Sequence, residues 1–467
     1  MLGRFRTNPT AWLTAATFGV YLLVVVGATA SLADAGAACS EWPLCGGTLS
    51  EPAVLVALTH HLMAAVVGVI VIGATVAVFR GATRRVKLTT LLALVLYPVQ
   101  AGIGAYLATT GALVPGAHLL FGILIFGTLL LALAWHLEAE TGGSDDPIER
   151  ATPEEIAATA TDEPNAPTVA LSSLSLTEQL KLRGSAYFRL MKPRLMWLLS
   201  LVAAAAMTLA AASGYGLDVT TILLTLGGGV LAIGASGTFN HVFERDRDKR
   251  MNRTNDRPLV RHQVPARNAI LFGFALTALS LALFLQLNPL AAALGLVAIL
   301  FYSVVYTLVL KPNTVQNTVI GGAAGSLPAL IGWAGVTGRI DVAALLLAGV
   351  IFVWTPAHFY NLALAYKEDY ARGGFPMMPV VRGETTTRKH ILFWLGATFA
   401  ATGALIWVTP VAWVTTLAAI AVSALFLWAV VRLHHEQTET AAFRAFHASN
   451  AYLGVLLLAI VVESLAF

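Results

Sequence analysis

Charged residues are scarce in this chain. They make up 12% of its 467 residues, whereas a soluble domain averages about 25%. So few charges cannot cover the surface of a soluble enzyme of this length, which excludes that class. The net charge of +4 does not indicate nucleic-acid binding, because long apolar runs recur along the chain. The chain also lacks the short alternating segments that form a transmembrane barrel.

Apolar residues are abundant, at 57% of the chain. Runs of about 20 such residues can cross a bilayer, where their peptide groups must be satisfied within helices. The sequence therefore predicts an all-α polytopic membrane protein with about thirteen transmembrane helices, four followed by nine. The predicted spans lie near 12–30, 53–79, 88–108, 117–137, 195–213, 218–240, 268–287, 290–310, 315–335, 341–360, 390–409, 411–432 and 446–466.

Basic residues indicate the orientation. Arg4 and Arg6 precede the first span, and the loop 31–52 after it has no Lys or Arg. Because Lys and Arg accumulate in cytoplasmic loops, the N-terminus is predicted to be cytoplasmic. Alternation of the spans places the loops 241–267 and 361–389 on the same side. We therefore expect a multi-pass protein of the cell membrane with both loops in the cytoplasm.

An acidic stretch interrupts the apolar pattern at residues 138–180. It has ten acidic side chains and one basic one, Arg150, for a net charge of −9. Pro, Thr, Ser and Ala fill most of the rest, so the composition predicts a flexible linker. This linker divides the chain into a four-helix module at 1–137 and a nine-helix module at 181–467.

The densest group of charges lies at residues 240–259. Asn240, Glu244 and Asp248 are spaced four residues apart, so a helix that continues through them puts all three on one face. Such oxygen ligands suit Mg²⁺, which also keeps phosphate and water ligands. Arginines suited to bind phosphate lie among them and just after them, at Arg245, Arg247, Arg250, Arg253 and Arg257. A basic cytoplasmic loop also explains these arginines, but it does not explain acids at helical spacing.

A second polar group follows the tenth span. The segment 354–361 contains His358, and Lys367 and Asp369 follow it. By the count of spans this group lies on the same side as the first, and two acidic groups together can hold metal ions and bind one polyanion. On its own, His358 is more typical of a hydrogen-bonded interfacial histidine than of a catalytic group.

Residues 185–467 resemble the heme O synthases of the membrane prenyltransferase superfamily. The matching segments are Lys192–Arg194, Asn240–Leu259, Tyr306–Lys311, Asn317–Gly325, Ile331–Gly338 and Trp354–Val381. The first acidic motif alone is typical of the whole superfamily, whereas the Gly-Trp and Thr-Pro-x-His segments point to the heme O branch. The resemblance implies nine helices around a central cavity, with farnesyl diphosphate and heme B as substrates and heme O as product.

The resemblance also implies roles for individual residues. Those implied to hold Mg²⁺ and diphosphate are Asn240, Glu244, Asp248 and Asp369. Those implied to contact phosphate are Arg253, Arg257, Lys311 and Lys367, and the residue implied near the heme is His358. The family usually has Asp in place of Glu244, whose carboxylate lies one methylene further from the backbone. We therefore expect Asp246 or Asp248 to hold more of the metal.

The two cysteines of the chain, Cys39 and Cys45, lie in the first outer loop. Their spacing fits no ordinary zinc site, and the outer side of the membrane is oxidising, which favours a disulfide between them. Two unrelated free thiols are the alternative.

Histidines lie at equal depth in two spans of the first module. His60 and His61 lie about seven residues below the outer end of the second span, and His118 lies at a similar depth in the fourth. Intramembrane histidines are candidates for function. This placement suits two axial ligands of one heme, and it suits hydrogen bonding between helices equally well.

Residues 12–137 resemble one four-helix half of the heme A synthases. The matching segments are Cys39–Gly47, His60–Ala64, Gln100–Ala105 and Thr110–Gly111, which lead to His118. The resemblance implies that His60 and His118 ligate a heme b. That family commonly has a Glu three residues before the first histidine, and this chain has Ala57 in that position. Whether this chain oxidises heme O to heme A is therefore left open.

Other functions fit some of these residues. One alternative is a prenyltransferase with another aromatic or lipid acceptor, and the other is a heme carrier or electron-transfer protein. Intact Asn240, Asp248 and Asp369 argue against the second alternative. Besides the lipid bilayer and the two substrates, we expect heme A synthase or terminal oxidase assembly partners, and no nucleic acid.

Overall fold

The computed structural model describes residues 8–32, 42, 43, 45, 48, 50–110, 115–161 and 175–466. The chain forms two compact units, one of Met1–Ser144 with Arg388–Ala466 and the other of Asp145–Thr387. These units differ from the two modules predicted on either side of residues 138–180, because the last helices of the chain pack with the first four. Within the first unit, for example, the Ser423 hydroxyl donates to the Tyr21 hydroxyl over 3.0 Å.

All regular structure in the described residues is helical, and thirteen helices are long and apolar enough to cross a membrane. The predicted fold class and number of spans are confirmed. Several helices extend beyond the predicted apolar runs, since polar ends continue the same hydrogen-bonding pattern. The first unit holds α2 (Pro9–Leu32), α3 (Pro52–Phe79), α4 (Arg84–Thr110), α5 (Pro115–Thr141), most of α18 (Glu384–Val408), α19 (Trp413–Glu436) and α20 (Glu439–Ala466).

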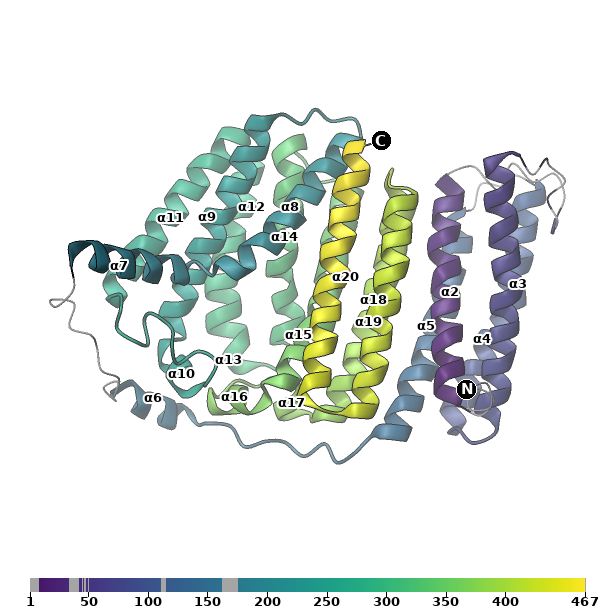
Figure 1. Ribbon diagram of the computed structural model, residues 1–467, viewed down its shortest axis with the longest axis horizontal. Helices are drawn as coiled ribbons and strands as arrows, with labels where there is room; N and C mark the ends of the chain where they lie inside the picture. Colours follow the sequence, from purple (N-terminus) through teal and green to yellow (C-terminus); the bar gives the residue numbers. More distant parts are fainter. Residues whose placement is uncertain are drawn as a thin grey trace. The chain divides into compact units, whose positions relative to one another are not determined.

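The second unit combines long helices with short ones. Its long helices are α8 (Pro193–Ala212), α9 (Val219–Phe243), α11 (Ala266–Leu287), α12 (Pro289–Leu300), α14 (Asn317–Thr337) and α15 (Val342–Ala365). Its shorter helices are α6 (Pro153–Thr161), α7 (Leu176–Leu190), α10 (Arg245–Arg250), α13 (Lys311–Asn313), α16 (Lys367–Arg372) and α17 (Met378–Val381). In Figure 1, α10, α13, α16 and α17 lie together at the lower end of this unit.

A π-helical segment, Phe301–Leu310, joins α12 to α13 within one membrane span. Its turns are wider than those of an α-helix, and the Lys311 N–H bonds to the carbonyl of Tyr306, five residues back. Single π-helical turns are frequent at functional sites. Here the segment carries Tyr302 and Thr307, and it ends where Lys311 begins α13.

Small residues let the long helices of the second unit approach one another closely. Gly332 on α14 lies against the backbone of α8, and a Cβ there would lie 2.4 Å from the carbonyl oxygen of Ala203. No side chain fits in that space, so the close approach of α8 and α14 requires glycine. These two helices form part of the wall of the cavity described below.

The acidic stretch 138–180 has more structure than its composition indicates. Helix α5 continues to Thr141, and α7 starts with a capping box in which Ser175 N–H donates to Glu178 Oε2 over 2.9 Å. Residues 145–156 lie against other segments of the second unit. The composition does not predict these contacts, because they are made by single carboxylates and by backbone groups. Residues 162–174 lie outside the described residues.

Candidate functional site

The first acidic motif forms one buried polar stripe. Helix α9 ends at Phe243, but the backbone continues with hydrogen bonds from Glu244 N to Asn240 O (2.9 Å) and from Asp248 N to Glu244 O (2.8 Å). These four-residue steps keep the three side chains on one face, as their spacing predicts. All three are almost fully buried in the second unit.

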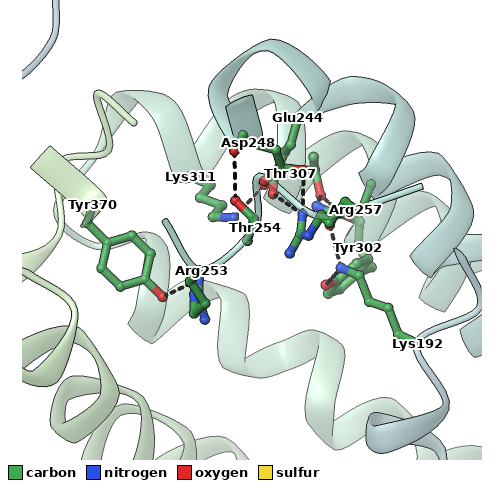
Figure 2. A network of polar contacts seen from close by, with 11 residues as sticks. Lys192, Glu244, Asp248, Arg253, Thr254, Arg257, Tyr302, Thr307, Lys311 and Tyr370 are labelled. Atoms are coloured by element: carbon green, nitrogen blue, oxygen red, sulfur yellow. Dashed lines mark hydrogen bonds and ion pairs between the residues drawn. The ribbon is translucent and has the colours of Figure 1, made fainter. Parts of the chain in front are cut away.

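Two cationic side chains contact the carboxylates of this stripe (Figure 2). Lys311 Nζ donates to Glu244 Oε1 over 2.5 Å. Arg257 Nη1 donates to Asp248 Oδ2 over 2.5 Å and lies 3.8 Å from Glu244 Oε2. The two acids are therefore held between a lysine from α13 and an arginine from the loop after α10.

A third cation, Lys192, contacts the other end of the stripe. Its ammonium donates to Asn240 Oδ1 and, over 3.2 Å, to the Tyr302 hydroxyl. The Asn240 amide in turn donates to Thr307 Oγ1 over 3.1 Å. Lys192 has a φ of 57°, in the left-handed region that non-glycine residues rarely adopt and that is often found at functional sites.

Asp369 joins the two loops of the site, which are residues 241–267 (the first loop) and residues 361–389 (the second loop). Its carboxylate accepts hydrogen bonds from the backbone N–H groups of Asn252 (3.2 Å) and Arg253 (3.0 Å), and it pairs with Arg372. The Arg253 guanidinium donates to the Tyr370 hydroxyl over 3.2 Å (Figure 2). Asp369 thus positions the backbone of the first loop, and Arg253 lies beside an aromatic ring from the second.

The electrostatics of the network favour an anion. Burial lowers the pKa of the Lys192 ammonium to about 7, and Arg257 lowers it further whereas Glu244 opposes the shift. Burial raises the pKa of the Asp248 carboxyl to about 6, against the opposing effect of Arg257. Burial also acts against ionisation of Glu244, but Lys311, Lys192 and Arg257 outweigh it and lower its pKa. A polyanion beside these cations would stabilise their charged forms.

Two buried polar atoms of the network have no hydrogen-bond partner in the described part of the chain. They are Asp248 Oδ1 and Arg253 Nε. A buried donor or acceptor without a partner is costly, so each is suited to a ligand: a cation for the carboxylate oxygen, and a phosphate oxygen for the guanidinium.

The donor set fits Mg²⁺ held jointly with a diphosphate. Within the ranges that the structure describes, no three His, Cys, Asp or Glu side chains are grouped as a metal site of protein ligands alone. Mg²⁺ needs no such cage, because it usually keeps water and phosphate ligands besides one or two carboxylates. Asn240, Glu244 and Asp248 supply oxygens of the type that it prefers.

A cavity of about 240 Å³ adjoins the network. Lys192 and Tyr302 belong to both, and the cavity extends from them between α8, α9, α14 and α15. Most of its lining is apolar or aromatic: Leu195, Leu199, Ala203, Leu226, Gly229, Ala232, Ile233, Gly237, Ala298, Tyr306, Gly321, Ala324, Gly325, Pro328, Ile331 and Phe359. The few hydroxyl groups come from Ser200, Thr225, Ser236, Thr318 and Thr355, besides Tyr302 and Tyr306. A cationic pocket that opens into an apolar cavity suits a prenyl diphosphate.

Comparison with known proteins decides the family. Residues 199–451 match the UbiA prenyltransferase family. The chain is 59% identical over 462 residues to the protoheme IX farnesyltransferase of Haloarcula marismortui, with 98% of each chain covered. It is 61% identical over 457 residues to protoheme IX farnesyltransferase 1 of Natronomonas pharaonis, with 97% of this chain and 98% of that one covered. The chain belongs to the UbiA prenyltransferase family.

Two further similarities concern the second module of this UbiA prenyltransferase. Protoheme IX farnesyltransferase 1 of Saccharopolyspora erythraea is 45% identical over 285 residues, which cover 90% of that protein and 60% of this chain. A solved structure of digeranylgeranylglyceryl phosphate synthase, 17% identical, covers 62% of this chain and 100% of its own with a TM-score of 0.52, and it shows the shared fold alone. The resemblance to heme O synthases is confirmed, and the resemblance of 12–137 to heme A synthases stays a prediction.

Three predicted residues of this prenyltransferase make contacts other than those of the network. His358 stacks on Trp354 with ring centroids 4.3 Å apart, whereas Thr355 and Phe359 of the same helix line the cavity. The other two are engaged in ion pairs. Lys367 pairs with Glu384 and lies 3.9 Å from Glu368, and Asp246 lies 3.1 Å from Arg245 and 4.0 Å from Lys249.

Sequence reasoning assigned no role to Lys192, Tyr302 or Thr307. A role for Lys192 could have been inferred from its position directly before Pro193. This proline starts a membrane helix at the side of the membrane where the acidic motif lies. Thr307 lay within the matching segment Tyr306–Lys311 but had no role, and Tyr302 carried no signal. The π-helical segment carries both, with Tyr302 bonded to Lys192 and Thr307 to Asn240.

In the first unit of the enzyme, His60 and His118 come from α3 and α5 and lie close enough to interact electrostatically. The Nδ1 atom of each is buried without a hydrogen-bond partner among the described residues. Glycines make room for both rings, since a Cβ at Gly27 would lie 3.1 Å from His60 and one at Gly104 3.0 Å from His118. The neighbouring His61 instead donates from Nδ1 to the carbonyl of Pro43 over 2.9 Å.

Cys45 is disulfide-bonded and buried beside Ala30, Val54 and Ala57. Its predicted partner, Cys39, lies outside the described residues.

Proposed function

We propose that this enzyme transfers the farnesyl group of farnesyl diphosphate to a vinyl group of heme B, giving heme O. The observation that carries the proposal is the apolar cavity that begins at Lys192 of the polar network. Its support from known proteins is the identity of 59% to a protoheme IX farnesyltransferase over 98% of both chains.

In this proposal the network binds the diphosphate and promotes its departure. The C1–O bond of farnesyl diphosphate breaks with its electron pair on the oxygen, so negative charge grows on the leaving group. Lys192, Lys311 and Arg257 are fixed in place by hydrogen bonds or ion pairs before the substrate binds, and preorganised cations stabilise such developing charge. Arg253 Nε is available to a phosphate oxygen.

Asn240, Glu244 and Asp248 would hold Mg²⁺, and Asp369 supports them through the loop backbone. The bound metal supplies further positive charge to the departing diphosphate. Glu244 is already paired with Lys311, whereas one carboxylate oxygen of Asp248 has no partner among the described residues. We therefore infer that Asp248 contributes more to the metal than Glu244 does.

The cavity would hold the farnesyl chain and exclude water from the cation. The π electrons of the heme vinyl group form a bond to C1 of the farnesyl group, which leaves a positive charge beside the porphyrin ring. A water molecule then adds its oxygen there and releases a proton, which gives the hydroxyethylfarnesyl side chain. A dry apolar wall keeps water from the farnesyl cation until the carbon–carbon bond has formed.

Gly229 on α9 offers a test of where the prenyl chain lies. It lines the cavity, and a Cβ there would meet nothing within 4 Å. Gly229→Leu should fill part of the cavity and raise KM for farnesyl diphosphate at least about 10-fold, with a smaller effect on geranyl diphosphate. Steady-state kinetics with both donors measure this.

Gly349→Leu is the matched control for that prediction. Gly349 also lies within a membrane helix, α15, with nothing within 4 Å of an added Cβ, but it does not line the cavity. Equal effects of the two substitutions would contradict the placement of the prenyl chain.

We further infer that the first unit binds heme b between His60 and His118. The two buried imidazole Nδ1 atoms, one on α3 and one on α5, have no hydrogen-bond partner among the described residues, which suits histidines that serve as the two axial ligands of one iron. In the purified chain supplied with heme, His60→Ala or His118→Ala should abolish the absorption bands of a bis-imidazole heme. His61→Ala should keep them, because His61 bonds to Pro43. Bands that survive both of the first substitutions would contradict this assignment.

The proposal places the enzyme in the cell membrane, with its N-terminus and prenyltransferase site in the cytoplasm. Arginines cluster in the loop that carries the acidic motif, as in cytoplasmic loops generally. Heme A synthase or a terminal oxidase assembly factor is the expected recipient of the product, since heme O leaves the site as an apolar, membrane-bound molecule.

A competition experiment tests the choice of acceptor. Purified full-length protein with Mg²⁺ and farnesyl diphosphate receives heme B and 4-hydroxybenzoate together, and the products are separated by mass. We expect farnesylated heme alone. Farnesylated hydroxybenzoate as the main product would assign the enzyme to another branch of the family.

A further inference from the structure

We propose that residues 145–156, here called the strap, position the two loops of the prenyltransferase site from outside the polar network. The strap belongs to the stretch whose composition indicates a flexible linker. In the structure it crosses α16, α17, α10 and the start of α18, all within the second unit. This inference rests on the proposed function, because the loops that the strap connects carry the residues assigned to diphosphate and Mg²⁺.

Backbone hydrogen bonds fix the strap to the second loop. The Ile148 N–H donates to Val380 O over 2.9 Å, and the Ala151 N–H donates to Ala371 O over 3.0 Å. Ile148 also packs against the buried cluster that contains Tyr370. Ala371 and Tyr370 belong to α16, the helix that carries Asp369.

The strap also contacts the first loop through α10. Arg250 on this helix donates from Nη1 to Glu155 O over 2.8 Å and from Nε to Arg372 O over 3.0 Å. One guanidinium therefore connects the strap, the first loop and the second loop. Ile156 lies against Gly374, where a Cβ would meet its Cδ1 at 2.7 Å.

Asp145 anchors the N-terminal end of the strap. Its carboxylate accepts hydrogen bonds from Thr385 N (2.8 Å), Thr386 N (2.9 Å) and Thr386 Oγ1 (2.7 Å), in the first turn of α18. These three bonds lower the pKa of the Asp145 carboxyl although partial burial opposes the shift. Such an acceptor satisfies N–H groups that the helix leaves unpaired.

The other acids of the strap are exposed. These are Asp146, Glu149, Glu154 and Glu155, whereas Ile148 and Ile156 face the unit and are half-buried. Only a minority of the side chains in the strap therefore contact the unit. The composition of the segment is determined by the exposed majority and does not reveal these contacts.

The connection to the site is direct. Helix α10 carries Asp248, and α16 carries Asp369, whose carboxylate holds the backbone of Asn252 and Arg253. Displacement of the strap would leave the two loops joined by fewer contacts, so that Asp248 and Arg253 would be less well aligned for one ligand. By linkage, a ligand that binds both loops should favour the docked strap.

Trypsin cleavage after Arg150 tests this coupling in the purified full-length chain. Arg150 is exposed within the strap, and docking should slow cleavage there. We expect Mg²⁺ with inorganic pyrophosphate to slow it further. Asp145→Ala should speed cleavage about 5-fold and raise KM for farnesyl diphosphate by a similar factor, because it removes a helix-capping acceptor.

The adjacent Asp146→Ala is the matched control, since it removes the same charge from an exposed position. Asp145→Asn should largely restore both quantities, because Asn also caps helices. Ile148→Asp should reproduce the effects of Asp145→Ala by a different contact.

Equal cleavage in the Asp145 and Asp146 variants, or no protection of the natural chain by Mg²⁺ and pyrophosphate, would overturn the proposal. Faster cleavage with unchanged KM would show a strap without influence on the site, which also overturns it. The trypsin assay with Mg²⁺ and pyrophosphate contains no heme. Its outcome is therefore independent of whether the protein farnesylates heme, so failure of the proposed function and failure of this inference can be told apart.

Discussion

Asp248→Ala should lower the rate of heme O formation by at least about 100-fold. This carboxylate is buried, pairs with Arg257 over 2.5 Å and has a second oxygen without a partner among the described residues. Its removal leaves Arg257 without that partner and takes away the oxygen assigned to Mg²⁺, and the loss of one such group at a charged transition state costs about 100- to 1,000-fold. Initial rates at saturating substrates measure the effect.

Asp256→Ala is the control for this prediction. Asp256 lies in the same motif but pairs with Arg189 at the surface, and exposed pairs contribute little. Its rate should stay within about 2-fold of that of the natural chain. A folded Asp248→Ala variant with full Mg²⁺-dependent turnover would contradict the assignment of the site.

Lys192→Ala should also lower kcat by about 100-fold. Lys192 touches Asn240 and Tyr302 and lines the cavity, so its ammonium lies where the diphosphate meets the prenyl chain. A charge held in place there acts mainly on the transition state, so kcat should fall more than KM rises. Steady-state kinetics with varied farnesyl diphosphate separate the two quantities.

Lys181→Ala tests whether loss of any nearby lysine has this effect, because Lys181 is exposed on α7. Its kinetics should match those of the natural chain. If Lys192→Ala raised KM and left kcat unchanged, the prediction would be wrong, because Lys192 would then stabilise bound farnesyl diphosphate and not the transition state.

Much of the fold could be predicted from the sequence. Apolar runs determine which segments cross a membrane, and thirteen spans are found where they were expected. The stripe of Asn240, Glu244 and Asp248 could be predicted because a four-residue spacing survives the break between α9 and α10. Backbone hydrogen bonds carry the helical register through Glu244.

The rest depends on tertiary contacts that local patterns do not encode. His358 and Thr355 lie on one helix, yet only Thr355 lines the cavity, because packing decides which face of α15 turns inward. Lys367 lies close to Asp369 in the sequence but pairs with Glu384 of α18. Asp145 makes three hydrogen bonds within a stretch whose composition indicates disorder.

Product analysis of the purified full-length chain tests the proposed reaction most directly. The chain is supplied with heme B, farnesyl diphosphate and Mg²⁺, and the hemes are separated and identified by mass. We predict heme O, formed together with an equal amount of diphosphate, and none after chelation of Mg²⁺. Unmodified heme B in the complete mixture, with a different acceptor farnesylated at the same site, would contradict the proposal.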